Sequence, residues 1–394
     1  MNPKRLFLAL GGDAANSIVS LLVTLIIAQV ADLGGFADYS MSILVYGAAL
    51  GMLHQVYADT AISREMSRPR EQYFASAALT PAVVLGALIT VWAIFTRDWF
   101  LFAVGCGLPG VTLYDYYRTL FRVRGEAANA FLMPVAVLAS VGFLSYFSLA
   151  RTLTPIVLFS GWFAVTSGIG IAMHLRRSRQ RVPIRDRHIF REELSLSWWF
   201  AVDFLAGSGG AQVAVLLIGI IVSPTLPAAL RAAGTLVGPL NVLSTTLRSL
   251  MIGHLSESVA RGGTQLEWRN AKRVGGLSLF VWTALGGLTF VLAQSFGGLL
   301  LGEAWSLGSQ VLVFVLVESW LAFLANVPAA GLRHRFAGRS SATLRILLGM
   351  VRPVIFLWSS LTHGLMGLAW SLVGFALISV LAWWVLYRRT LARR

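Results

Sequence analysis

The sequence has 394 residues, of which 57% are hydrophobic and only 12% are charged, and its mean hydropathy is +0.73. Soluble globular proteins carry about 25% charged residues, so this composition excludes a water-soluble globular protein and indicates a polytopic membrane protein. The net charge of +15 does not indicate nucleic-acid binding, because the basic residues are scattered among apolar runs and no soluble segment presents a basic face.

Two further features of the sequence bear on its class. The residues MNPKR resemble the start of a signal peptide, but Asp13 interrupts the apolar stretch, which continues to about Val30. We therefore expect a first span that is retained. The single cysteine, Cys106, excludes an intramolecular disulfide and a thiolate metal cluster; we expect it to pack among apolar residues, and no cofactor is expected.

Twelve apolar segments are long enough to cross the hydrocarbon core, which requires about 20 residues. These predicted spans cover residues 7–31, 38–60, 73–96, 99–119, 128–149, 153–175, 196–222, 227–252, 275–300, 307–328, 341–361 and 365–387. The predicted fold class is therefore all-α, a membrane protein of about 12 transmembrane helices.

The distribution of basic residues supports this number of spans. With a cytoplasmic amino terminus, all but six of the 32 lysines and arginines fall on cytoplasmic segments, and only Arg97 and Arg151 fall on outside loops. Lysine and arginine gather on cytoplasmic loops, so we predict a multi-pass protein of the cell inner (plasma) membrane with both termini in the cytoplasm. The other four lie within predicted spans: Arg231, Arg248, Arg345 and Arg352.

The chain reads as two halves of six spans each, residues 1–182 and 183–394, joined by a basic segment at 176–193. Asp13 and Asp203 occupy equivalent places early in the first span of each half. Because six is even, both halves enter the membrane from the same side. The repeat is therefore parallel, as in transporters whose lobes move about a central site.

Polar residues in the first predicted span recur at spacings of three and four and form one stripe. The stripe consists of Asp13, Asn16, Ser17, Ser20 and Thr24. Polar side chains are costly in hydrocarbon, so the stripe is expected to face another helix or a water-filled cavity. Hydrogen bonding between helices remains the alternative for the serines and the threonine, and a cavity or coupling role remains equally open for Asp13.

Further polar residues lie in later predicted spans. The segment GSGGAQ at 207–212 predicts a flexible point or a close approach between backbones. In the span at 227–252, Asn241 and Arg248 share a face, whereas Arg231 is near the opposite end and is expected to snorkel outward.

The end of the fourth predicted span combines aromatic and charged residues. Asp115 is expected to pair locally with Arg118 or Arg122, which we assign with their neighbours to a cytoplasmic segment. The three tyrosines beside them suit the aromatic belt at the membrane interface: Tyr114, Tyr116 and Tyr117.

Arg345 and Arg352 are seven residues apart, close to two full helical turns, so they share one face roughly 10 Å apart. Arg352 is expected near the membrane midplane, where an unpaired guanidinium costs at least ~3 kcal/mol. Its partner is either an acidic side chain, with Glu318, Asp13 or Asp203 as candidates, or an anionic group of a substrate, because the planar guanidinium matches phosphate oxygens. The two interpretations are compatible.

Three local patterns carry a resemblance to a known family. They are glycine-containing turns into a following span: LGGFADYSMSILVYGAAL (33–50), SPTLPAALRAAGTLVGPLNVL (223–243) and THGLMGLAWSLVGFALI (362–378). With the two six-span halves and the basic segment between them, the chain resembles the MOP (multidrug/oligosaccharidyl-lipid/polysaccharide exporter) superfamily, in particular its O-antigen-type polysaccharide-biosynthesis flippases. The resemblance implies two lobes around a central cavity.

The resemblance also implies a function. A flippase of this kind translocates a polyprenyl-diphosphate-linked oligosaccharide by alternating access, has membrane lipids as partners, and is not an enzyme; a coupling proton or cation is left open. The arginines expected to bind the diphosphate are Arg352, Arg345, Arg248 and Arg231. The residues expected to line the polar cavity or to take part in coupling are Asp13, Asn16, Ser17, Asp203, Asn241 and Glu318.

Three alternatives remain. A cation-coupled multidrug exporter on the same fold would depend on the carboxylates of Asp13, Asp203 and Glu318. A membrane glycosyltransferase or polymerase is disfavoured by the short outside loops, where Asp32 and Asp38 are the only candidate acidic pair. A scaffold without transport activity in a polysaccharide-export complex is the third.

Overall fold

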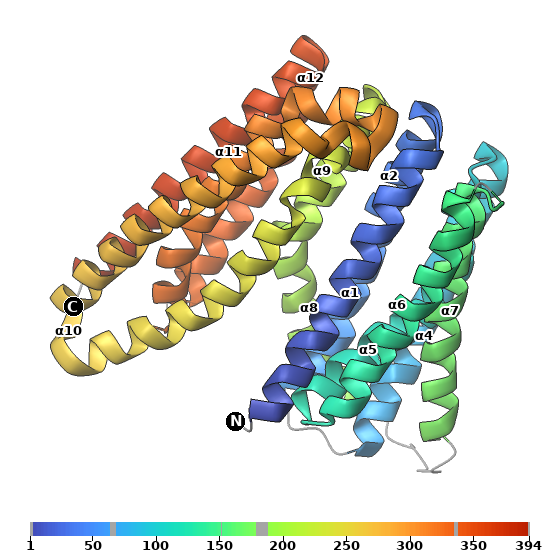
Figure 1. Ribbon diagram of the computed structural model, residues 1–394. Helices are drawn as coiled ribbons and strands as arrows, with labels where there is room; N and C mark the ends of the chain where they lie inside the picture. Colours follow the sequence, from blue (N-terminus) through green and yellow to red (C-terminus); the bar gives the residue numbers. More distant parts are fainter. Residues whose placement is uncertain (1–2, 64–67, 151, 179–187, 335–337, 393–394) are drawn as a thin grey trace. The chain divides into compact units, whose positions relative to one another are not determined.

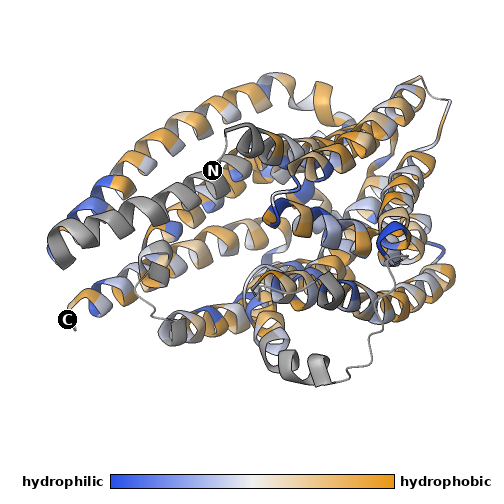
Figure 2. Cartoon of the chain, turned by 90° about the horizontal axis from the view of Figure 1, so that it is seen from below, coloured by the Kyte–Doolittle hydropathy of each residue, from blue (hydrophilic) through white to orange (hydrophobic). Residues whose placement is uncertain are grey.

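The computed structural model describes residues 3–63, 68–150, 152–178, 188–334 and 338–392 (Figure 1). These residues are almost entirely helical and contain no β-strand. Seven of the described helical segments, or eight if one bent pair is counted, are long and apolar enough to cross a membrane. Hydrophobic residues predominate along the helices in Figure 2. The predicted all-α, polytopic membrane fold is confirmed.

The chain divides into two compact units, residues 1–212 and 213–394. Helices of the first unit follow the first six predicted spans: α1 (Pro3–Val30), α2 (Leu33–Leu53) continued by the π-helix η1 (His54–Asp59) and by α3 (Thr60–Ser63), α4 (Arg68–Thr96), α5 (Trp99–Val123), α6 (Ala127–Leu149) and α7 (Pro155–Ser178). The seventh predicted span is a bent pair, α8 (His188–Ala206) and α9 (Ser208–Ile221). The predicted lobe boundary between residues 182 and 183 stays a prediction.

Two aspartates start helices in the first unit. The side chain of Asp32 accepts a hydrogen bond from the backbone N–H of Gly35 at 2.8 Å, and that of Asp98 accepts one from Leu101 at 2.9 Å. Each side chain satisfies an amide that has no partner within the first turn of its helix. Asp32, considered above as an external acidic candidate, therefore has a structural role as a helix cap.

Tyr39 organises the packing around the end of α1. Its ring is fully buried and makes edge contacts with Phe100 and Phe159, with ring centroids 5.9 and 5.5 Å apart. Its hydroxyl is hydrogen-bonded to the Oγ1 atom of Thr24 at 2.6 Å. The last residue of the polar stripe thus joins α1 to α2, as expected for hydrogen bonding between membrane helices.

Glycines allow helices of the first unit to approach closely. A Cβ atom built at Gly170 of α7 would lie 2.1 Å from the carbonyl oxygen of Gly110 in α5. Lipid tails are as apolar as the helix surfaces, so no hydrophobic driving force brings membrane helices together. Their association depends on close packing, which small residues at the interface allow. The contact between α5 and α7 therefore depends on the absence of a side chain at residue 170.

The segment GSGGAQ, expected to be a flexible point or a close approach between backbones, follows a bend and packs against a side chain. The helix bends by 50° between α8 and α9. The ring of Phe204 then fills the space where a Cβ atom at Gly209 would lie, at 2.3 Å, and approaches Gly51 of α2 in the same way at 2.5 Å. Both glycines are required for this ring to fit.

The second unit contains four further helical elements: α10 (Thr225–Leu301), the short 3-10 helix η2 (Gly302–Ala304), α11 (Trp305–His334) and α12 (Gly338–Ala392). The predicted spans 227–252 and 275–300 lie in one continuous helix, α10, which turns back on itself in Figure 1. The segment between them, which we expected to be a loop, lacks proline and is rich in helix-forming residues, so the helix continues through it.

The last two predicted spans, 341–361 and 365–387, lie within α12. They are separated by Gly364, whose φ of 58° interrupts the helical backbone. This left-handed conformation is readily accessible only to glycine, so a single residue takes the place of the expected turn.

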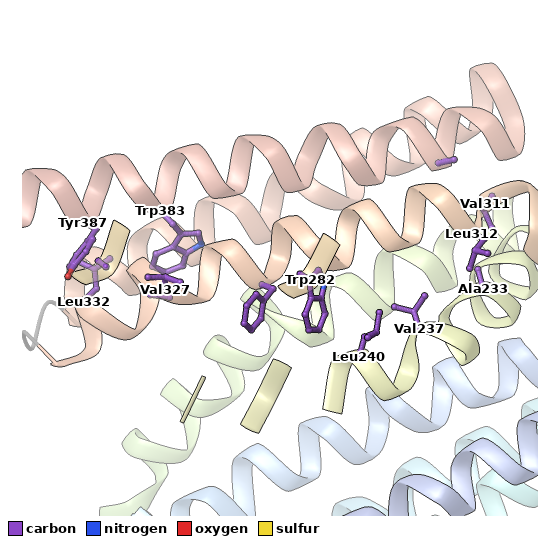
Figure 3. Close-up of a cluster of buried hydrophobic side chains, with 14 of the residues drawn as sticks. Ala233, Val237, Leu240, Trp282, Val311, Leu312, Val327, Leu332, Trp383 and Tyr387 are labelled. Carbon is purple, nitrogen blue, oxygen red and sulfur yellow. The ribbon is translucent and has the colours of Figure 1, made fainter. Parts of the chain in front are cut away.

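A large apolar cluster holds the second unit together. Both legs of α10 contribute to it, together with α11 and α12. Trp282 stacks on Phe323 with ring centroids 4.7 Å apart and planes at 9°. Figure 3 shows the cluster extending from Tyr387 and Leu332 at one end, past Trp282, to Leu312 at the other.

We predict that Gly170→Ala destabilises the protein, because a methyl group there overlaps the backbone of α5 and overpacking costs about 1–3 kcal/mol. Gly142→Ala in α6 is the matched control, since a Cβ atom at this exposed helical glycine meets nothing within 4 Å. Thermal unfolding in detergent measures both variants. A midpoint for Gly170→Ala at or above that of Gly142→Ala would contradict the close approach.

Candidate functional site

A network of ionisable side chains lies among the helices of the first unit. Its members come from α1, η1 and α5, and all are contained in helices rather than in connecting loops. They are Asp13, His54, Asp59, Asp115, Arg118 and Arg122.

Arg118 is at the centre of this network. Its Nη1 atom donates to Oδ1 of Asp13 at 3.0 Å, and its Nη2 atom donates to Oδ1 of Asp115 at 3.1 Å. Arg122 donates to the other oxygen of Asp13, also at 3.0 Å. Arg118 is only 17% exposed, whereas Arg122 and Asp13 are 41% and 43% exposed. The guanidinium of Arg118 therefore bridges α1 to α5 in a largely buried position.

His54 extends the network to η1. Its Nδ1 atom contacts Oδ2 of Asp115 at 2.5 Å, and its Nε2 atom is 3.5 Å from Oδ1 of Asp59. Residues five positions apart are hydrogen-bonded neighbours in a π-helix, so the π-helical stretch His54–Asp59 brings His54 and Asp59 to the same side. Short π-helical segments occur frequently at functional sites.

The network adds to two sequence-based assignments. Arg118 and Arg122, expected on a cytoplasmic segment, lie near the end of α5 and pair with Asp13, and their side of the membrane stays a prediction. Asp115 does pair locally with Arg118, as expected, and also with His54, which sequence reasoning missed. Three carboxylates alternate with three cationic or protonatable groups, because an uncompensated charge in a low-dielectric environment costs several kcal/mol.

The signal for this site was present in the spacing of α5. Asp115, Arg118 and Arg122 follow intervals of three and four residues, which place them on one face of a helix. The rest of the predicted stripe is less involved: Asn16 is half-buried, and the exposed hydroxyl of Ser17 donates to the backbone oxygen of Asp13 at 3.0 Å.

A second charged site occupies the middle of the second unit. At a rise of about 1.5 Å per residue, Glu318 lies about 20 Å from the start of α11, and Arg352 lies about 21 Å from the start of α12. Oε1 of Glu318 is 3.8 Å from Nη2 of Arg352. The structure thus brings together Arg352 and one of its three predicted acidic partners.

Aromatic rings complete the surroundings of Arg352. Its guanidinium carbon lies 5.0 Å from the ring centroid of Phe356 and 5.5 Å from that of Phe375. Such contacts stabilise a cation through the negative face of the ring. The Nε atom is buried and donates to no hydrogen-bond acceptor among the described residues. The guanidinium is therefore positioned, but its hydrogen-bonding capacity is not fully used.

The other predicted site residues are more dispersed. Arg345 is half-buried on α12, Arg231 is half-buried on α10, Asp203 is half-buried on α8, and Asn241 is exposed on α10. Arg248 lies outside the residues whose side chains the structure describes.

The three tyrosines of α5 are not an interfacial belt. Tyr114, Tyr116 and Tyr117 are all buried. The hydroxyl of Tyr116 donates to the backbone oxygen of Glu71 at 2.9 Å, and that of Tyr117 is hydrogen-bonded to Nδ1 of His174 at 3.0 Å. Tyr116 and Tyr117 thus join α5 to α4 and α7, and all three rings pack within the bundle.

Among the described residues there is no group of three or more His, Cys, Asp and Glu side chains arranged to hold a metal ion. Cys106, expected to pack among apolar residues, is exposed on α5.

We predict that Arg118→Met lowers the free energy of unfolding by about 3–5 kcal/mol, because it leaves two carboxylates without their shared guanidinium. The control is Arg122→Gln, which removes a more exposed charge and is expected to cost at most about 1 kcal/mol. Denaturant unfolding in detergent micelles compares the two, and equal losses would contradict a buried bridging role for Arg118.

Comparisons with known proteins place this fold. No protein-family model matches the sequence, and no curated protein sequence matches it. Solved structures do match. An inward-facing MATE-family multidrug resistance transporter of the MOP superfamily aligns with a TM-score of 0.68 and 13% identity over 98% of each chain.

The lipid II flippase MurJ, in an inward closed conformation, aligns with a TM-score of 0.73 and 9% identity over 96% of this chain and 86% of that one. A MOP-superfamily transporter from Pyrococcus furiosus, for which a binding pocket of reverse polarity was described, aligns with a TM-score of 0.58 and 13% identity over 98% of this chain and 94% of that one. The chain is therefore a multi-pass membrane protein with the fold shared by MATE transporters and the lipid II flippase.

Proposed function

We propose that this protein is a flippase that translocates a polyprenyl-diphosphate-linked oligosaccharide across the bacterial inner membrane, for polysaccharide biosynthesis. Transport would proceed by alternating access between the two six-helix lobes, 1–182 and 183–394, with both termini in the cytoplasm. The diphosphate would bind arginines in a central cavity, the sugars would contact polar side chains, and the lipid tail would remain in the bilayer.

Arg352 is the observation that carries this proposal. It is a largely buried guanidinium in the middle of a helix, its only ion pair with a described residue is the 3.8 Å contact to Glu318, and its Nε donor is unused within the described part of the chain. Charge-assisted hydrogen bonds are normally about 2.7–2.9 Å long, so the pair is loose. An arriving phosphate group offers the guanidinium shorter and more numerous hydrogen bonds than Glu318 does.

Similarity of fold supports a lipid-linked substrate. The same helical arrangement is found in a protein described as a lipid II flippase. Transport of a lipid-linked headgroup requires no covalent chemistry and no metal. It requires a polar path whose charges are compensated when no substrate is bound. Glu318 supplies that compensation for Arg352 in the unloaded state.

The remaining predicted residues complete the proposal. Arg231, Arg345 and Arg248 would add positive charge for the diphosphate. Asp13 is partly exposed beside Arg122 and would offer polar contacts to the sugars. The other residues proposed for the polar path are Asn16, Ser17, Asp203 and Asn241.

We predict that Arg352→Ala lowers the transport rate at least about tenfold, the effect of losing roughly 1.4 kcal/mol of binding in the rate-limiting state. Arg388→Ala is the control, because Arg388 is exposed near the end of α12. Glu318→Gln should retain transport, since the guanidinium stays in place and loses only a competitor for the phosphate. If Glu318→Gln and Arg352→Ala fail equally, the pair is structural and does not bind substrate.

The function itself is tested in reconstituted vesicles loaded with fluorescent lipid-linked oligosaccharide in the inner leaflet. We expect protein-dependent appearance of the glycan in the outer leaflet, measured by its accessibility to a membrane-impermeant lectin. Protein that is folded, as judged by gel filtration, and yet gives no gain over empty vesicles would refute the proposal.

A cation-coupled multidrug exporter remains the second candidate. The specific observation in its favour is the set of three carboxylates in the first unit, Asp13, Asp59 and Asp115, together with the MATE transporters among the structures of the same fold. Efflux of cationic dyes from cells that express the protein distinguishes the two functions. Dye efflux that is abolished by Asp13→Asn, without glycan flipping in vesicles, would favour the exporter.

A further inference from the structure

A cavity of about 350 Å³ lies at one end of the first unit. It is formed where α4 begins, α5 ends, α6 begins and α7 ends, and α4 and α7 reach the lower edge of the view in Figure 1. Its lining combines apolar side chains, including Leu120, Phe121 and Met173, with charged ones. This position, at the ends of membrane helices, corresponds to the level of lipid headgroups.

Both carboxylates that line the cavity already have arginine partners. Glu71 pairs with Arg124 at the end of α5. Nη2 of Arg177 donates to both oxygens of Glu126, at 2.9 and 2.8 Å. Burial by itself would raise the pKa of Glu126, but the hydrogen bonds and positive charge of Arg177 hold that pKa below its ordinary value. Glu126 is therefore ionised, and each of the two carboxyl groups is paired with an arginine of the first unit.

Positive charge remains after this compensation. Three arginines, at 124, 176 and 177, face two carboxylates. Arg176 is exposed, lines the cavity, and forms no hydrogen bond or ion pair with any described residue. Within the described part of the chain, Arg177 donates only through Nη2, to Glu126, and its guanidinium carbon lies 4.6 Å from the ring centroid of Phe121. The cavity therefore presents guanidinium donors that are available to an anion.

Apolar side chains line the same cavity as these donors. Met173 of α7 comes three and four residues before Arg176 and Arg177, so the three share one face of the helix, and Leu120 and Phe121 of α5 also line the cavity. A ligand suited to this lining has an anionic head and an apolar tail. A free anion would use the guanidinium donors only.

We propose that this cavity binds the phosphate headgroup of an anionic phospholipid from the adjacent leaflet. The phosphate accepts charge-assisted hydrogen bonds from Arg176 and from the unused nitrogens of Arg177. The acyl chains leave the cavity past Met173, the apolar residue that α7 contributes to its lining. Basic pockets between transmembrane helices are suited to anionic headgroups in this way. This site is separate from the Arg352 site and does not depend on the proposed transport function.

The test is native mass spectrometry of the full-length protein with added phosphatidylglycerol or phosphatidylcholine. We expect the wild type to retain phosphatidylglycerol preferentially, and Arg176→Gln to weaken its binding about tenfold, the effect of losing one charge-assisted hydrogen bond. Arg388→Gln removes an exposed arginine from another helix end and should leave binding unchanged. Arg176 is exposed, so its replacement does not threaten folding, which thermal unfolding verifies.

Several results would overturn the proposal. They are equal retention of the two lipids by the wild type, and equal loss of phosphatidylglycerol in Arg176→Gln and Arg388→Gln. A further arm adds inorganic phosphate in large excess. If inorganic phosphate alone occupies the site in an Arg176-dependent way and the lipid does not, the cavity binds free phosphate and the assignment to a phospholipid is wrong.

Discussion

A charged side chain among apolar helices must be compensated, and this constraint determines much of what is distinctive in the structure. Removing a carboxylate or a guanidinium from water costs several kcal/mol, and the cost is offset only by an opposite charge in good geometry. In the first unit, Asp13 receives two arginines, and Asp115 receives an arginine and a histidine. These contacts fix the positions of α1, η1 and α5 relative to one another. Glycines at 170 and 51 allow the surrounding helices to pack closely.

The two charged sites satisfy this constraint to different degrees. Arg118 has oxygen partners at 3.0 and 3.1 Å, whereas Arg352 has one at 3.8 Å. The Nε atom of each arginine is buried without an acceptor among the described residues, so the difference lies in the terminal nitrogens. The first arrangement is a tight bridge between helices. In the second arrangement, two aromatic rings hold the guanidinium of Arg352 in place. A group from outside the protein can offer it a closer hydrogen-bond acceptor than Glu318 does. This difference is why a substrate anion is assigned to Arg352 and not to Arg118.

The end of α5 shows how one short basic segment serves several purposes. Arg118 and Arg122 contact Asp13 of α1, and Arg124 pairs with Glu71 of α4. Because these carboxylates are already paired, Arg176 in the neighbouring cavity has no acidic partner among the described residues. Its charge is available to an external anion. Positive charge at a membrane interface is thus divided between holding helices together and contacting the lipid headgroups.

The sequence by itself determined the fold class and where most helices lie, because transfer of a helix into hydrocarbon depends on local composition. It also named Glu318 as one of three partners for Arg352, since few acids occur in the spans. It did not determine which acid. Asp13 and Arg118 are 105 residues apart in the chain, and their contact exists only because α1 and α5 are neighbours.

The same reason applies to His54, which contacts Asp59 within the π-helical turn and Asp115 on a separate helix. It also applies to the three tyrosines of α5, which we expected at the membrane interface and which are buried. Tertiary structure alone decided these contacts, because periodicity identifies the face of a helix but not the helix that packs against it.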